Sequence, residues 1–177
     1  MNEINHPRLF NANKAIAEHF GVRQPAVYVD TKQKLGLAMA YFDSESIVVA
    51  SGVEELFDDG ELKALFAHET KHFYQRTART IGGVRRNEHD ADRAAVAATD
   101  METIRSYVDK AAEMMIEKMV PFKPLKELIL KIHRAAPGLL ACATIFPTDR
   151  EHPPVSKRLS EMQRYEDTHG SKGLNSH

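Results

Sequence analysis

Strand-forming sequence in this chain is confined to one early stretch, and helical periodicity dominates the remainder. Residues 26–30 are rich in β-branched and aromatic side chains, as is typical of a strand. Residues 37–42 and 47–51 flank a polar turn and predict an antiparallel hairpin. From residue 53 onwards, apolar residues recur at helical spacing. The sequence therefore predicts an α+β domain that is mostly helical, with a small antiparallel β-sheet near the N-terminus.

The first helix is marked by residues with strong positional preferences. Residues 7–20 place apolar side chains on one helical face. Pro7 suits the first turn, and Gly21 suits the position just after the last turn. A short helical piece is expected over 53–57, directly after the predicted hairpin. These two helices therefore bracket the predicted sheet in the sequence.

A capping-box pattern opens the longest predicted helix. Asp58 is followed three residues later by Glu61, a pairing that satisfies backbone donors at a helix start. It predicts a helix over 60–80. We expect Gly82-Gly83 to end this helix, since glycine is unfavourable in a helix interior.

Helical spacing continues through the second half of the chain. A helix is expected to begin near Asn87 and to continue to about Met119. It should break at a capping-box pattern made by Thr99 and Glu102. The last helix is expected after Pro153 and the proline that comes next. Another helix is predicted between Met119 and Pro153. It has an apolar stripe made by Leu125, Leu128, Ile129 and Ile132.

Length and composition limit the class of protein. The 177 residues suit a single domain, which we place at 1–168, with a flexible polar tail at 169–177. Lys and Arg number 24 against 25 Asp and Glu, so bulk charge gives no reason to expect nucleic-acid binding. One cysteine, Cys142, excludes a disulfide scaffold and a cysteine-rich metal site.

The chain also lacks the sequence signals of membrane insertion and secretion. Its longest mainly apolar run, 139–146, contains Thr144 and is far shorter than the roughly 18 residues that a spanning helix needs. The N-terminal segment carries an early Glu3 and lacks the apolar core of a signal peptide. We therefore expect a cytoplasmic protein with no integral membrane segment.

The sequence HETKH, residues 68–72, lies inside the helix predicted over 60–80. His68 and His72 are about 40° apart around a helix, so both imidazoles can reach one metal ion. Glu69 lies to the side of that face, where it can take a proton from a metal-bound water. An ordinary helix with two histidines at the edge of the core shows the same pattern. A metal site therefore needs further ligands elsewhere in the sequence.

A carboxylate near the start of the next predicted helix can complete such a site. Catalytic zinc sites use three protein ligands and leave one position for water. Glu88 could supply the third ligand, and Asp92 could accept the remaining N–H of a ligating histidine. Acidic residues in a first turn also stabilise the helix dipole, which is an alternative role for both. His89 faces about 100° away from Glu88, so we interpret it as a solvated residue.

Together these motifs resemble the gluzincin metallopeptidases grouped with the CAAX prenyl-protein endoprotease and the HtpX heat-shock protease. The resemblance covers about residues 27–159. It rests on the run that ends in HETKH, on EHDAD at 88–92, and on HPP at 152–154 with Arg158 after it. The metzincin pattern is absent, because it needs Gly and His where the chain has Gln75 and Ala78.

The resemblance implies a zincin-like domain and a role for each matched residue. The implied ligands of one Zn²⁺ ion are His68, His72 and Glu88. Glu69 would be the general base, and Asp92 would contact a ligating histidine. His152 would lie beside the substrate and stabilise the developing oxyanion, with Arg158 supporting the site.

The sequence therefore predicts a zinc-dependent metalloendopeptidase that acts on a peptide or an unfolded protein. Glu69 would remove the proton of the attacking water and deliver it to the leaving amine. The strand predicted over 37–42 could hold an extended substrate by β-augmentation. The substrate would then lie along Ala38, Met39 and Ala40.

Three alternatives remain open. One is another zinc-peptidase lineage, the regulatory proteases of the ImmA type, which share the HExxH pattern but lack the late HPP…R segment. Another is a metal- and peptide-binding module without catalysis, although a site of that kind has no use for Glu69. The third is a latent protease that needs an activating protein partner to order the chain after Gly82.

Overall fold

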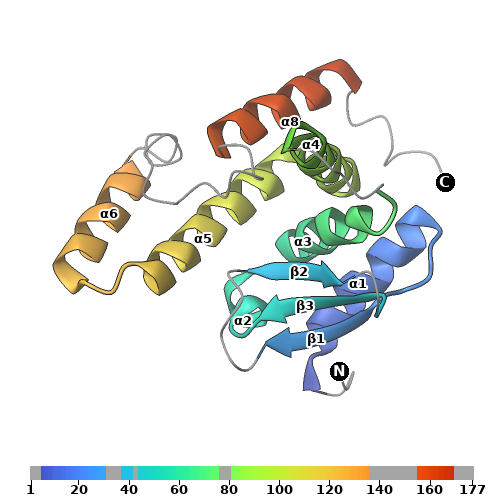
Figure 1. Ribbon diagram of the computed structural model, residues 1–177, viewed down its shortest axis with the longest axis horizontal. Helices are drawn as coiled ribbons and strands as arrows, with labels where there is room; N and C mark the ends of the chain where they lie inside the picture. Colours follow the sequence, from blue (N-terminus) through green and yellow to red (C-terminus); the bar gives the residue numbers. More distant parts are fainter. Residues whose placement is uncertain (1–4, 31–36, 42–43, 76–80, 136–154, 170–177) are drawn as a thin grey trace.

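The computed structural model describes residues 5–30, 37–41, 44–75, 81–135 and 155–169 (Figure 1). Its strands are β1 (Ala26–Asp30), β2 (Ala38–Tyr41) and β3 (Ser46–Ala50). Its helices are α1 (Pro7–Phe20), α2 (Val53–Leu56), α3 (Asp59–His72), α4 (Ile81–Ala98), α5 (Met101–Met119), α6 (Lys123–Ala135) and α8 (Val155–His169). These elements confirm a mostly helical α+β domain with a small sheet near the N-terminus. None of these helices combines the length and the apolar character needed to cross a membrane.

The three strands form a mixed sheet in the order β1-β3-β2. β2 and β3 form the predicted antiparallel hairpin, in which Ala38 lies opposite Val49. β1 pairs with the other edge of β3 in parallel, with Ala26 opposite Ser46. The prediction of an antiparallel sheet is therefore wrong for β1. Local alternation predicts that a segment is a strand, but it does not reveal the direction in which distant strands pair.

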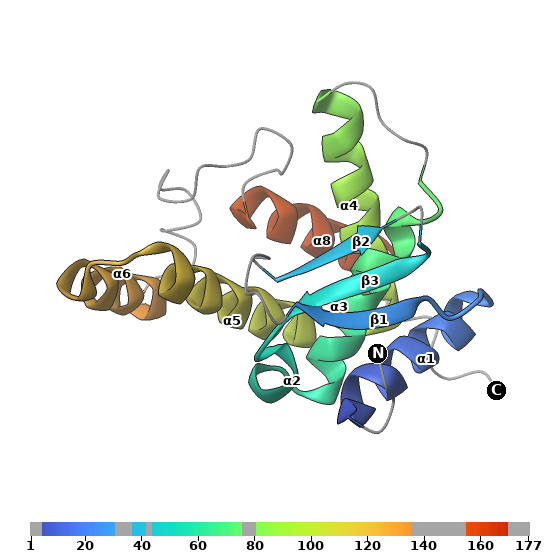
Figure 2. The same cartoon turned by 60° about the horizontal axis from the view of Figure 1, so that its bottom comes forward.

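α1 and α3 cover one face of the sheet (Figures 1 and 2). α1 has its predicted limits, with Pro7 in the first turn and Gly21 in the left-handed conformation at φ 64°. Side chains from α1, the sheet and α3 form one core, in which a fully buried Leu or Ile contributes roughly 1.5–3 kcal/mol. The largest fully buried apolar residues of this core include Leu9, Ile16, Ile47, Leu62, Leu65 and Phe66.

The predicted capping box at the start of α3 is present. Asp58 accepts a hydrogen bond from the backbone N–H of Glu61 at 2.9 Å, and Glu61 accepts one from the backbone N–H of Asp58 at 2.8 Å. α3 begins at Asp59 but ends at His72, so it is shorter than the predicted helix over 60–80. Residues 73–75 form a turn, and 76–80 lie outside the described residues.

α4 begins earlier than the sequence predicts, at Ile81 rather than near Asn87. Gly82 and Gly83 are helical, so the prediction that they end the preceding helix is wrong. Both glycines lie in the first turn of α4, where the cost that glycine carries in a helix interior does not fully apply. The chain after Gly82 is helical, and the alternative of a latent protease that needs an activating partner stays a prediction.

The break between α4 and α5 lies where the sequence predicts it, but its cap is different. Asp100, rather than Thr99, is the N-cap residue of α5. Its carboxylate accepts hydrogen bonds from the backbone N–H of Thr103 at 2.7 Å and from the Thr103 hydroxyl at 3.0 Å. The predicted pairing of Thr99 with Glu102 is therefore wrong by one residue.

α5 and α6 form a helical hairpin that extends away from the sheet (Figures 1 and 2). A separate small core between them contains Ile116, Val120, Ile129 and Leu130. The predicted apolar stripe on α6 is only partly buried, because Leu125 and Leu128 are exposed. α8 packs against α4 and α5 and includes His169, which the predicted flexible tail at 169–177 had placed outside the last helix. Residues 170–177 lie outside the described residues.

Candidate metal centre

The C-terminal half of α3 packs against the middle of α4 and brings the two sequence motifs together. His68 is buried and His72 is half-buried, one turn later on the same helix face. Glu88 and Asp92 are both buried on α4. Because α4 begins at Ile81, neither carboxylate lies in its first turn. The alternative role of stabilising the start of this helix therefore does not apply to them.

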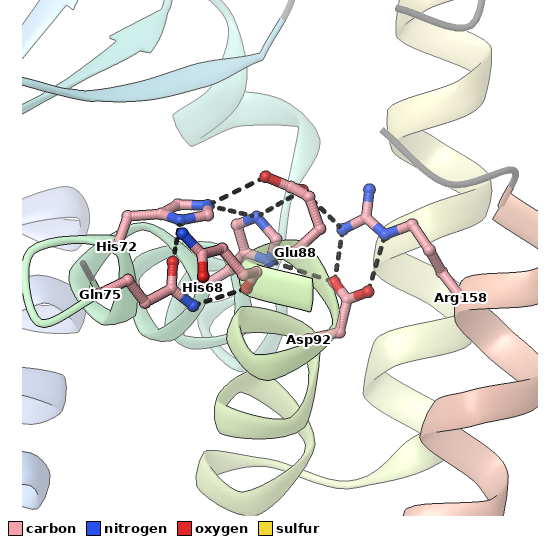
Figure 3. A network of polar contacts seen from close by, with 7 residues as sticks. His68, His72, Gln75, Glu88, Asp92 and Arg158 are labelled. Atoms are coloured by element: carbon pink, nitrogen blue, oxygen red, sulfur yellow. Dashed lines mark hydrogen bonds and ion pairs between the residues drawn. The ribbon is translucent and has the colours of Figure 1, made fainter. Parts of the chain in front are cut away.

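Three ligand atoms converge between the two helices (Figure 3). Nε2 of His68 and Nε2 of His72 are 3.2 Å apart. Oε2 of Glu88 lies 3.6 Å from Nε2 of His68, and Oε1 of Glu88 lies 3.5 Å from Nε2 of His72. The two imidazoles and the carboxylate thus form a compact triangle, which we call the ligand triangle.

The donor set of the ligand triangle suits a zinc ion. With bonds of about 2.0–2.2 Å, a tetrahedral zinc ion holds neighbouring ligand atoms about 3.3–3.5 Å apart. The two ring nitrogens, 3.2 Å apart, are close to that spacing. A different oxygen of Glu88 is nearest to each ring, at 3.6 Å and 3.5 Å, and with one ligand atom from each residue all three lie within 4.8 Å of one another. Two imidazole nitrogens and one carboxylate oxygen also form a donor set that catalytic zinc sites use. By the chemistry of the donor set these residues fit a zinc ion, and their ligand atoms lie close together around one point.

A carboxylate orients the ring of His68. Nδ1 of His68 lies 3.1 Å from Oδ1 of Asp92. Burial raises the pKa of Asp92, but the contacts with Arg158 and His68 together outweigh burial and hold the pKa well below the usual range. Asp92 is therefore ionised and accepts a hydrogen bond from the Nδ1–H of His68. That contact leaves Nε2 of His68 as the atom that faces the ligand triangle.

An amide orients the ring of His72 in the same way, through a residue that the sequence motifs did not indicate. Gln75 donates a hydrogen bond from Nε2 to the backbone carbonyl of Asn87 at 2.5 Å, which fixes its amide orientation. Its Oε1, 2.6 Å from Nδ1 of His72, must therefore accept the Nδ1–H. Gln75 comes three residues after His72, a spacing that places neighbours on one helix face and could have suggested the contact.

Because of these two contacts, Nε2 of both rings faces the ligand triangle. With Nδ1–H of His68 and of His72 directed outward, a neutral imidazole presents a lone pair on Nε2. Two such lone pairs at 3.2 Å, beside a carboxylate, require a positive charge between them. The centre therefore favours a cation at this point, whether a proton or a metal ion.

The pKa values agree with this electrostatic picture. Burial lowers the pKa of His68, but the hydrogen bonds to Asp92 and Glu88 outweigh it and raise the pKa to about 10. Burial lowers the pKa of His72, and the neighbouring His68 lowers it further. The surroundings of His68 thus attract positive charge, while His72 is held as the neutral imidazole that metal ions bind.

Arg158 reaches the site from α8. Its Nε donates to Oδ2 of Asp92 at 2.8 Å, and its second contact, from Nη2 to Oδ1, completes a two-point fork. Nη2 also lies 4.0 Å from Oε2 of Glu88. Burial lowers the pKa of Arg158, but Asp92 outweighs this and raises it, so the guanidinium remains charged. Arg158 therefore holds Asp92 in the position from which it contacts His68.

The remaining predicted residues have different placements. Glu69 is half-buried on α3 and is not a member of the ligand triangle. Ala38 and Ala40 are half-buried on β2, and Met39 lies opposite Val48 in the sheet register. His152 lies outside the described residues.

His89 is half-buried rather than solvated as predicted, and it also lies outside the ligand triangle. The structure thus brings five predicted site residues into one centre: His68, His72, Glu88, Asp92 and Arg158. It adds Gln75 to them through a contact with a ligand ring. In comparisons with known proteins, no family model, no curated protein and no solved structure matches the chain.

Proposed function

We propose that this chain is a zinc-dependent metalloendopeptidase. The observation that carries the proposal is the ligand triangle, in which two helices present Nε2 of His68, Nε2 of His72 and the Glu88 carboxylate to one point. A zinc ion held there would have three protein ligands, which is the number that leaves one position for water. When bound, zinc supplies Lewis-acid activation of that water and of the scissile carbonyl.

Glu69 is proposed as the general base. It comes directly after His68 in α3 and is half-buried. Burial has the largest effect on two nearby pKa values, because it lowers that of His72 and raises that of Tyr107. The negative charge of Glu69 raises both pKa values. The charge of Glu69 is therefore felt at one of the ligand rings. Glu69 would take the proton of the attacking water and deliver it to the leaving nitrogen as the C–N bond breaks.

β2 is proposed as the strand that holds the substrate. In the described part of the sheet, β2 pairs with β3 on one side only. β2 also contacts α3, the helix that carries both histidines. An extended peptide that pairs with the other edge of β2, along Ala38, Met39 and Ala40, would run beside the zinc ligands. His152 is proposed to stabilise the oxyanion of the substrate carbonyl.

Replacement of Glu69 tests this function. Glu69→Gln should retain one zinc per chain while its cleavage of a denatured protein falls by about 100-fold or more, because only the proton acceptor is lost. Glu102→Gln, an exposed carboxylate on α5, is the matched control and should change neither measurement. Zinc content is measured by elemental analysis and cleavage by the release of new amino termini.

Two outcomes would contradict the proposal. Equal cleavage by Glu69→Gln and the unchanged chain would exclude Glu69 as the base. A zinc-loaded unchanged chain that cleaves no denatured protein would point to a metal-binding module without catalysis.

A further inference from the structure

The helical hairpin of α5 and α6 carries a group of exposed apolar side chains close to its turn. Phe122 is 65% exposed, Leu125 46% and Leu128 54%, and we call these three residues the apolar patch. The other large exposed hydrophobic residues of the described part of the chain are tyrosines, which carry a polar hydroxyl. Apolar residues exposed singly are normal, whereas several grouped together indicate a surface that binds a partner or a membrane.

The apolar patch lies on a side of α6 that does not face α5. Ile129 and Leu130 of α6 fill the small core of the hairpin. The direction midway between Leu125 and Leu128 is about 120° around the helix from the direction midway between those two core residues. Phe122 comes directly before the first turn of α6. Packing of α6 on α5 therefore leaves the apolar patch uncovered.

α6 is also strongly positive, although the whole chain is nearly neutral. Its charged residues are four cations and one anion: Lys123, Lys126, Lys131, Arg134 and Glu127. The net charge of this helix is therefore +3, against −1 for the whole chain. An apolar helix face combined with lysine and arginine on the same helix is typical of helices that lie at the surface of a membrane.

Two of the four cations are available to a partner outside the chain. The other two pair with carboxylates of α5 at 2.9 and 2.7 Å. Lys123 is 85% exposed and lies 3.9 Å from Glu127, a contact between exposed groups that contributes little to stability. Lys131 is exposed and lies about 60° from Leu128 around the helix. Lys123 and Lys131 therefore carry positive charge next to the apolar patch.

The position of α6 in the molecule makes the patch accessible to a large flat surface. α6 lies at one end of the long axis, and the sheet and α3 lie away from that end (Figure 1). The hairpin projects from the rest of the fold in both views (Figures 1 and 2). A flat surface can therefore contact α6 while the metal centre stays clear of it.

We propose that the apolar patch, with Lys123 and Lys131, binds the surface of an anionic lipid bilayer. The three apolar side chains would enter the headgroup region, and the two ammonium groups would pair with lipid phosphates. The charge of α6 favours this occupant over a second copy of the chain. A symmetric dimer formed through the patch would bring two helices of net charge +3 together.

Co-sedimentation of the full chain with lipid vesicles tests the proposal. The chain should bind vesicles of phosphatidylcholine mixed with phosphatidylglycerol. It should bind vesicles of phosphatidylcholine alone about tenfold or more weakly, because each lysine near an anionic surface strengthens binding by about fivefold. High salt should weaken binding to the mixed vesicles, because it screens the lysines.

Variants separate the apolar contribution from the charged one. Leu125→Ser combined with Leu128→Ser should weaken binding to the mixed vesicles by about tenfold or more, because less apolar area enters the bilayer. Lys123→Gln and Lys131→Gln should each weaken binding by about fivefold. Because all four side chains are exposed, far-UV circular dichroism should remain unchanged. Tyr28→Ser, at a 47% exposed position on β1, is the matched control and should bind normally.

Several results would overturn the proposal. They are no binding to the mixed vesicles, equal binding to both kinds of vesicle, and normal binding by the double leucine variant. A dimer of the unchanged chain that the double variant dissociates would also overturn it, because a second copy would then cover the patch. Zinc content is measured in the same samples. A chain that binds the mixed vesicles but holds no zinc would contradict the proposed function and leave this inference supported.

Discussion

Two buried polar clusters lie along α3, one near each end, and they satisfy their charges in different ways. Near the start, Glu61 is 0% exposed and receives donors from the chain itself. The backbone N–H of Asp58 at 2.8 Å and Nζ of Lys110 at 2.7 Å donate to Oε2, and the Ser106 hydroxyl donates to Oε1 at 2.5 Å. This cluster needs nothing from outside the protein.

Near the end of α3, the ligand triangle has the opposite arrangement. The ring donors of His68 and His72 are directed outward to Asp92 and Gln75. The atoms that meet in the middle are two imidazole nitrogens and the carboxylate of Glu88. Burial of charge therefore does not by itself indicate function. A cluster that supplies its own donors stabilises the fold, whereas one that turns lone pairs inward is suited to a cation.

Removal of a ligand should give the largest effect. His68→Ala is expected to weaken zinc binding on the order of a thousandfold, because one of three protein ligands is lost. Competition with a zinc-chelating dye measures the affinity, and far-UV circular dichroism checks that the helices remain. His89→Ala, beside Glu88 but outside the ligand triangle, is the control and should bind zinc normally. Affinity within a few-fold of normal in His68→Ala would place the metal elsewhere.

Substitution of Glu61 should lower the stability of the fold without changing metal binding. Glu61→Ala is expected to lower the free energy of unfolding by about 3 kcal/mol, since Lys110 and Ser106 lose a buried partner. Urea denaturation measures this value, and the folded protein should still bind one zinc ion. Glu102→Ala should change stability by less than about 0.5 kcal/mol. If Glu61→Ala lost its zinc while fully folded, the contrast between the two clusters would be wrong.

The contact between Gln75 and the ring of His72 should contribute less than a ligand does. Gln75→Leu is expected to weaken zinc binding by about 10- to 100-fold, because the ring of His72 loses its hydrogen-bond acceptor. Gln75→Glu keeps an acceptor and should restore most of the affinity. Gln163→Leu on α8 is the control. A Gln75→Leu variant with normal zinc affinity would show that packing alone orients the ring.

The cap of α3 should give the smallest effect. Asp58→Ala removes the N-cap and should lower the free energy of unfolding by about 1 kcal/mol, with no change in zinc affinity. Thermal and urea denaturation measure it, and Asp167→Ala, an exposed acid on α8, is the control. A much larger loss would mean that the cap also holds Glu61 in place and that the two residues act as one unit.

Local sequence patterns predicted the elements better than their pairing. The limits of β1 and α1, the capping box at Asp58 and the break before α5 all depend on residues close in sequence. The position of β3 between β1 and β2 depends on contacts between distant segments, so alternation did not predict it. Gly82 and Gly83 were predicted to end a helix, but they lie in the first turn of the next one.

The sequence predicted those residues of the candidate site that belong to a recognisable motif. The spacing of His68 and His72 follows from helix geometry alone. Glu88 and Asp92 were predicted in a first helical turn, and the early start of α4 instead buries them beside α3. The spacing of Gln75 from His72 could have suggested their contact, but the bond to the backbone of Asn87 that fixes the Gln75 amide joins residues twelve apart, which no local pattern encodes.

Elemental analysis of the zinc-loaded, dialysed chain beside Glu88→Ala is the decisive test of the metal centre. Glu88 is the ligand that joins α4 to the two histidines of α3. We expect about one zinc ion per unchanged chain and less than about a tenth of that in Glu88→Ala. An unchanged chain without zinc, or equal zinc in both proteins, would contradict the assignment of these residues as zinc ligands.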